Sequence, residues 1–175
     1  TIFRINPTTK TIEQVFRINF PGSTVSQYAV RSVVLTANGE LIVSVKAQGA
    51  NVLVARMTLD GQKIWTKRIS FSLNQYYQER HIENRNIQVF DDAVWLTCQR
   101  MLVKLNLQTG EVLASTQLPF AAADYTTPNN VMPAGNYVMV HCRNSYQHLD
   151  LFFFDKNTLS FSHSIGRKVN RSGVI

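Results

Sequence analysis

The feature of this sequence that most constrains its fold is a hairpin pattern that recurs along the chain. In each copy, alternating apolar residues approach a turn rich in Thr, Asp, Gly and Asn, and a second alternating run leaves it. Taking Arg4, Arg56, Lys104 and Phe153 as equivalent gives a step of about 50 residues. The copies are FRINPTTKTIEQV (3–15), ARMTLDGQKIW (55–65), VKLNLQTGEVL (103–113) and FFFDKNTLSF (152–161). The recurring unit is therefore predicted to contain paired strands.

A second hairpin precedes each of the last three copies. These hairpins are VVLTANGELIVSV (33–45), IQVFDDAVWLTC (87–98) and NVMPAGNYVMVHC (130–142). Their turns are predicted at Asn38-Gly39, Asp91-Asp92 and Gly135-Asn136, of which Asn-Gly is the strongest hairpin signal. Each full unit is then four antiparallel strands, and no segment shows the 3.6-residue periodicity of a helix. The predicted units span 28–70, 85–119 and 129–166, with half a unit at 1–20 and the start of a further strand or a tail at 167–175.

Four-stranded units at this spacing resemble the blades of a β-propeller, in which sheets pack radially around a channel. The resemblance covers nearly the whole chain and points to the quinoprotein (PQQ-like) and WD-like propeller superfamily. Ala55, Gly61 and Trp65 match the quinoprotein blade signature, whereas Met57 stands where that signature has Asp. The next unit keeps a Thr-Gly turn at 109–110. The resemblance implies an all-β propeller of about three and a half blades.

Ring closure then predicts that the sequence is a piece of a larger protein. Propellers have roughly four to eight blades and commonly complete one blade with strands from both chain ends. Two strands for the opening half blade would have to follow Gly166, where RKVNRSGVI offers too few residues. A four-bladed ring closed by partial strands is the alternative. The absence of a starting Met and of a leader at Thr1 also favours a processed or excised segment.

Composition limits the functional classes without selecting one. The 175 residues are 45% hydrophobic, but no apolar run approaches the length of a membrane span. The net charge is +7 with only 17% charged residues, and the basic residues are scattered, which permits an anionic partner without requiring one. Nucleic acid is disfavoured as a partner, because no dense basic track interleaved with aromatic residues is present.

The reactive side chains do not form a catalytic pattern. Cys98 and Cys142 fall, with Val45, at matching points of the second strand, so both thiols are predicted to be buried and reduced. His141 adjoins Cys142, but strand alternation places it on the opposite face. The carboxylates of Asp91-Asp92 are explained by turn chemistry. No phosphate loop, nucleophile elbow or metal-ligand spacing is present, so no catalytic residue, metal or cofactor is predicted.

The loops are therefore the predicted binding surface. Long segments connect the units at 20–28, 70–85 and 119–130, and such loops tend to be functional. Basic residues also recur just after the second strand of successive units. The candidate binding residues are Lys46, Tyr76, Tyr77, Arg80, His81, Arg100, Tyr125 and Arg143. Tyrosine and arginine are enriched at interface anchors, although aromatic residues in these loops could instead fill gaps between blades.

Three functional hypotheses remain open. The first is a non-enzymatic scaffold or recognition module that binds a protein or a glycan through its inter-blade loops, within a larger chain or assembly. The second is a fragment of a quinoprotein-like dehydrogenase, for which carboxylates and an Arg should converge on the channel with calcium. The third is a receptor-binding component of a virion or cell surface. The lack of a catalytic pattern favours the first.

Overall fold

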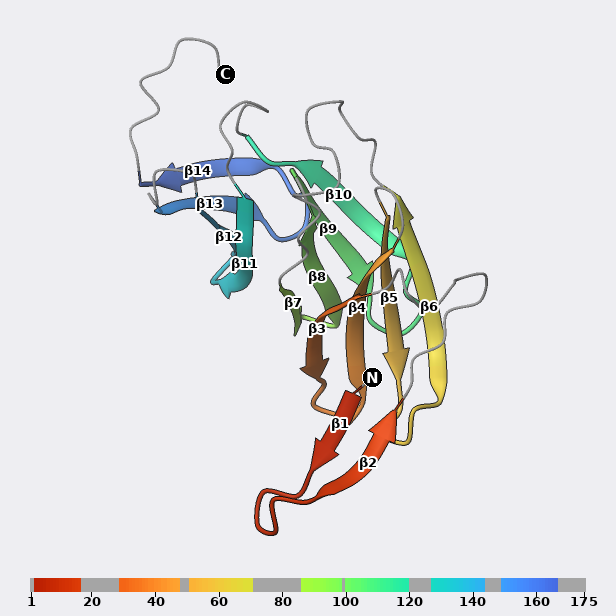
Figure 1. The fold of residues 1–175 in the computed structure, drawn as a ribbon. Helices are drawn as coiled ribbons and strands as arrows, with labels where there is room; N and C mark the ends of the chain where they lie inside the picture. Colours follow the sequence, from red (N-terminus) through yellow and green to blue (C-terminus); the bar gives the residue numbers. More distant parts are fainter. Residues whose placement is uncertain are drawn as a thin grey trace.

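The computed structural model describes residues 2–16, 29–47, 51–70, 86–98, 100–119, 127–143 and 149–166. Within these residues the chain forms strands β1 to β14 and no helix, as the hairpin pattern predicts (Figure 1). None of these described segments has a helix with the length and hydropathy that crossing a membrane requires. Strands β1 (Ile2–Ile5) and β2 (Ile12–Phe16) pair with each other as a two-stranded sheet.

The other strands form three four-stranded antiparallel sheets, each ordered as in the sequence. The first sheet contains β3 (Ala29–Leu35), β4 (Leu41–Ala47), β5 (Asn51–Met57) and β6 (Lys63–Ser70). The second contains β7 (Ile87–Phe90), β8 (Ala93–Cys98), β9 (Met101–Asn106) and β10 (Val112–Gln117). The third contains β11 (Thr127–Ala134), β12 (Tyr137–Arg143), β13 (Leu149–Asp155) and β14 (Phe161–Ile165). The predicted all-β class is confirmed.

The turns between third and fourth strands share one hydrogen-bonding pattern, which explains the recurring sequence motif. The side-chain oxygens of Asn6, Asn106 and Asp155 each accept the backbone N–H groups two and three residues later. The residue four positions on has a positive φ in each copy: Lys10, Gly110 and Leu159. The β5–β6 turn is one residue shorter and is closed instead by hydrogen bonds between Thr58 and Gln62.

The sheets pack face to face in chain order, and two apolar clusters lie between them (Figure 1). Ile42, Val52 and Val54 of the first sheet pack against the second sheet, including Val103 and Leu105. Trp95 and Leu102, on the other face of the second sheet, pack against the third sheet, including Phe152 and Phe154. Cys98 and Cys142 are buried in these clusters as free thiols, as predicted.

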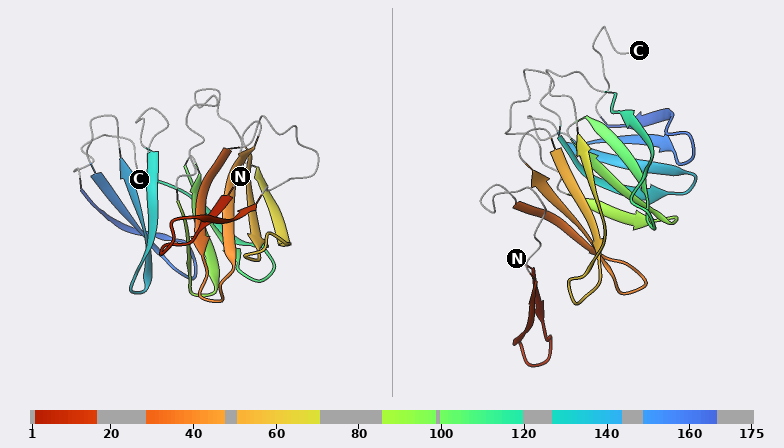
Figure 2. Two further views of the ribbon diagram at one scale, coloured as in Figure 1. Left: turned by 60° about the horizontal axis from the view of Figure 1, so that its bottom comes forward. Right: turned by 90° about the vertical axis from the view of Figure 1, so that its right-hand side faces the viewer.

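No described sheet packs on the face of the first sheet that is turned away from the second sheet. The central strands β4 and β5 nevertheless carry a buried apolar cluster on that face, and exposure is confined to the β3 side. The hairpin β1–β2 lies apart from the three larger sheets (Figures 1 and 2), and within the described residues β1 pairs only with β2. Val33 is 41% exposed, whereas the residues at its position in the next two sheets, Ile87 and Val131, are fully buried. The described chain is therefore a partial propeller, with three blades and the outer half of another.

Candidate functional site

Three of the predicted basic residues, Lys46, Arg100 and Arg143, lie at one edge of the sheets. Strands β4, β8 and β12 are the second strands of their sheets. Their C-terminal ends lie at the edge opposite to the turns that join first to second and third to fourth strands (Figure 2). Lys46 directly follows Val45 and Arg143 directly follows Cys142, so these two cations occupy equivalent register positions. Lys46, Arg100 and Arg143 together are called the basic rim below.

The members of the basic rim differ in exposure. Arg143 is the last residue of β12 and its side chain is exposed. Arg100 lies in the tight connection between β8 and β9 and is half-buried, and its carbonyl accepts the N–H of Leu118 at 2.6 Å. Lys46 is placed by its backbone, between Ala29 and Val52 in the sheet. Lys46 and Arg143 thus occupy equivalent register positions in the first and third sheets, whereas Arg100 is less exposed than Arg143.

The remaining predicted site residues lie outside the described part of the chain. These are Tyr76, Tyr77, Arg80, His81 and Tyr125. They stay predictions, and so does the alternative that the aromatic ones fill gaps between blades.

The two cysteines are not activated. Burial raises the pKa of the Cys98 thiol to about 12. Burial also raises the pKa of Cys142, and the nearby negative charge of Asp150 acts in the same direction. A thiol nucleophile needs the opposite shift, toward the thiolate. Both thiols are therefore protonated at neutral pH and serve as small apolar groups in the clusters between the sheets.

Asp91 and Asp92 form the tip of the β7–β8 hairpin, where both have positive φ values. Asp91 accepts a charge-assisted hydrogen bond from Lys156 of the third sheet, at 2.5 Å between Oδ2 and Nζ. This pair joins two sheets and is an ordinary structural contact. Within the described residues, no three His, Cys, Asp or Glu side chains are grouped so as to hold a metal ion.

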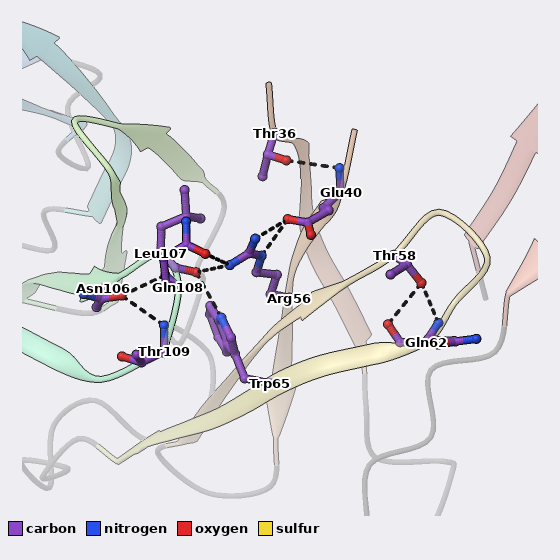
Figure 3. A network of polar contacts seen from close by, with 10 residues as sticks. All are labelled: Thr36, Glu40, Arg56, Thr58, Gln62, Trp65, Asn106, Leu107, Gln108 and Thr109. Carbon is purple, nitrogen blue, oxygen red and sulfur yellow. Dashed lines mark hydrogen bonds and ion pairs between the residues drawn. The ribbon is translucent and has the colours of Figure 1, made fainter. Parts of the chain in front are cut away.

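A polar network that was not predicted from the sequence joins the first two sheets (Figure 3). Arg56 on β5 is buried and pairs with Glu40, with both Nε and Nη2 2.6 Å from Oε2. Its Nη1 donates to the carbonyl of Leu107 at 3.1 Å and to Oε1 of Gln108 at 2.6 Å. The indole Nε1 of Trp65 donates to the same Leu107 carbonyl at 3.0 Å. These five residues are called the Arg56 network.

The same contact recurs one sheet further along. Lys104, at the position of Arg56, donates to the carbonyl of Lys156 at 3.0 Å and lies 4.9 Å from the ring centre of Trp95. In both interfaces, a cation on the third strand reaches the turn of the next sheet. Arg56 and Lys104 marked the repeat in the sequence, and that recurrence was the available signal for this role. This contact holds neighbouring blades in one relative orientation. It therefore also sets the relative positions of the rim residues that the blades carry.

A second pair of hydrogen bonds joins the first strands of adjacent sheets. The Oγ of Ser32 accepts the N–H of Ile87 at 3.3 Å, and Nδ2 of Asn86 donates to the carbonyl of Asn129 at 3.3 Å. Ser32 pairs with Ser44, and Asn86 lies at the corresponding position just before β7. Each interface is therefore held at both its inner and outer strands.

Comparison with known proteins supports the fold of the chain but assigns it to no family. No family model matches the chain, and no curated protein matches its sequence. Among solved structures, a protein of unknown function from Bacteroides caccae is similar with a TM-score of 0.58 and 10% identity, over 82% of this chain and 48% of that one. BamB from Moraxella catarrhalis gives 0.56 and 13%, over 89% and 43%. A quinohemoprotein alcohol dehydrogenase from Pseudomonas putida HK5 gives 0.54 and 14%, over 73% and 19%.

This chain has the fold of a partial β-propeller. The predicted resemblance is confirmed at the level of fold, which is all that such low identities show. The chain spans about half the length of the first of these similar structures and less of the others.

Proposed function

We propose that this partial propeller is a non-enzymatic recognition module that binds an acidic protein surface along the basic rim. The observation that carries the proposal is the equivalent placement of Lys46 and Arg143, one at the end of the second strand in each of two sheets. The net charge of +7 favours an anionic partner. We include the loop residues Arg80, His81 and Tyr125 in the proposed surface, together with Tyr76 and Tyr77.

The energetics require several contacts to act together. One exposed ion pair contributes about 0.2–1 kcal/mol and is screened by salt. A set of cations held on a rigid edge raises the association rate and aligns the partner more than it raises affinity. The hydrogen bonds between sheets at Arg56 and Lys104 supply that rigidity. Binding should therefore be moderate in strength and should weaken steeply with added salt.

The test uses a fluorescein-labelled poly-glutamate peptide as the acidic probe, with fluorescence anisotropy at low and physiological salt. The variant Arg80→Glu/Arg100→Glu/Arg143→Glu should bind the peptide about ten-fold or more weakly at low salt, with a shallower salt dependence. Arg143→Glu alone, at an exposed position, should give part of the loss, and circular dichroism checks that this variant is folded. Lys63→Glu is the matched control, because Lys63 is exposed at the opposite edge of the first sheet.

The same assay separates the alternatives. Unchanged peptide binding by the triple variant would place the site elsewhere on the propeller. Tighter binding to heparin than to poly-glutamate would favour an anionic glycan, and equal binding to a single-stranded oligonucleotide would indicate charge attraction without recognition. A loss caused equally by Lys63→Glu would show that net charge, and no particular edge, determines binding.

A further inference from the structure

The first sheet gathers further cations at the edge that carries the basic rim. In the register of this sheet, Lys46 of β4 lies level with Ile69 of β6, so Arg68 and Lys67 lie one and two rows further in. Arg31 of β3 lies between these same two rows, at a shift in the register. Arg31, Lys67 and Arg68 are called the first-sheet cations below.

The first-sheet cations are accessible and are not engaged by the fold. Arg31 and Arg68 are exposed, and Lys67 is half-buried. Within the described residues, no hydrogen bond or ion pair engages any of these three side chains. Arg56 of the same sheet is instead buried and paired with Glu40. A cation without a counter-ion in its own chain keeps its full attraction for an external anion.

Carboxylates are kept away from this end of the first sheet. The described residues of the sheet include two carboxylates, Glu40 and Asp60, and both lie at turns of the opposite edge. In the third sheet, by contrast, Asp150 pairs with Cys142, one row from Arg143. The attraction for an anionic partner is therefore stronger at the first sheet than at the third.

The register also shows on which side of β6 the two neighbouring cations lie. Lys67 pairs with Val54, which packs against the second sheet, whereas Arg68 pairs with Leu53 of the cluster on the opposite face. Directly opposed residues of neighbouring strands share a face of the sheet, and successive residues alternate between faces. The end of the outer strand thus carries one cation on each side.

The spacing of these cations limits the kind of anion that can contact them together. β3 and β6 are the two lateral strands of the sheet, three strand spacings or roughly 14 Å apart (Figure 1). The Debye length at physiological salt is about 8 Å, so cations on these two strands act nearly independently. One small anion cannot contact both, whereas a protein surface with several separate carboxylates can.

We propose that the first-sheet cations are the main contact for the acidic partner, with Arg100 and Arg143 as a secondary contact. This inference rests on the proposed function and specifies where on the edge the carboxylates of the partner bind. The partner presents at least two separate acidic patches, one over β3 and one around the end of β6. Its contact is therefore centred on the first sheet and reaches the outer strand of the propeller.

Two double variants with the same change in charge test the inference by fluorescence anisotropy of fluorescein-labelled deca-glutamate. An extended chain of ten residues spans about 33 Å, which covers the distance from β3 to β6. Arg31→Glu/Arg68→Glu should bind the peptide at least about ten-fold more weakly at low salt, because two attractions become repulsions. Arg100→Glu/Arg143→Glu should lose less. Arg31→Lys/Arg68→Lys keeps both charges and should restore most of the binding that the Glu variant loses.

Lys10→Glu/Lys63→Glu is the matched control, because both residues are exposed, Lys10 in the hairpin β1–β2 and Lys63 at the opposite end of β6. This control has the same change in charge and should lose little binding. Circular dichroism and protection of the cysteines from thiol reagents report that each variant is folded. Arg31→Gln/Arg68→Gln replaces the Glu variant if that variant does not fold.

The outcomes separate this inference from the proposed function. An equal or larger loss for Arg100→Glu/Arg143→Glu would overturn the inference and leave the proposed function standing. If neither double variant loses more binding than the control, both are overturned. Equal losses in all three variants would show that net charge alone determines binding, which would also overturn the inference.

Discussion

Gly110→Ala is expected to lower the free energy of unfolding by more than its backbone strain alone, because the added methyl group also disturbs the packing of the first two sheets. Gly110 has a φ of +73°, and a Cβ at this position would lie 2.6 Å from Cε3 and 2.8 Å from Cδ2 of the Trp65 indole. The indole has little freedom to move away, because its Nε1 donates to the Leu107 carbonyl of the same turn at 3.0 Å. The added methyl group must therefore displace either the turn or the ring.

Two costs add at this position. Placing an L-residue in the left-handed region costs about 1–2 kcal/mol, and overpacking a contact costs about 1–3 kcal/mol more. Gly39 (φ +78°) and Gly135 (φ +61°) provide matched controls, because an added Cβ at either position would meet no atom within 4 Å. Gly39→Ala and Gly135→Ala should show only the first cost, so their difference from Gly110→Ala isolates the Trp65 contact.

Urea and thermal unfolding followed by circular dichroism measure these differences. For a chain of this size, each kcal/mol corresponds to a Tm shift of about 2–4 °C. The excess loss of Gly110→Ala should vanish in a Trp65→Ala background, where the clashing ring is absent. Equal losses for Gly110→Ala and Gly39→Ala would refute the close packing of Trp65 on this turn.

Two further predictions concern titratable groups. Cys98 and Cys142 should react slowly with thiol reagents in the native protein and rapidly in denaturant. Burial raises the pKa of Cys98 to about 12, whereas the pKa of a thiol in the unfolded chain is about 8.5. The free energy of unfolding should therefore fall as pH rises above about 8.5, and a stability independent of pH in this range would contradict buried thiols. Hydrogen bonds from the N–H groups of Thr158 and Asn157 lower the pKa of Asp155, so its contribution to stability should be present above about pH 4 and lost as pH falls through the lowered pKa. Asp155→Asn should keep the turn, as Asn106 does in its own copy, but without this acid sensitivity. Asp155→Ala should lower the Tm, and equal Tm values for these two variants would contradict the role of the side-chain oxygen.

Local hydrogen bonding made much of the fold predictable from sequence. The Asn6, Asn106 and Asp155 turns are closed by side chains within three residues, so their recurrence could be recognised without knowing how the sheets pack. Strand alternation likewise predicted that Cys98 and Cys142 face neighbouring sheets.

The contacts between sheets were less accessible to sequence reasoning. The partners of Arg56 lie about one repeat away, at Leu107 and Gln108, so they depend on how one blade is rotated against the next. The same limit applies to the basic rim. Lys46 and Arg143 follow directly from strand register, whereas the half-buried position of Arg100 depends on the tight connection after β8.

Amide hydrogen exchange measured by mass spectrometry tests the partial-propeller account most directly. If the three sheets pack face to face, the central strands β4, β5, β8 and β9 should be strongly protected together with β12, because their side chains lie in the shared clusters. The outer strand β14, whose residues are exposed, should exchange faster. Strong protection in one sheet, with rapid exchange throughout the other two, would contradict the packed arc.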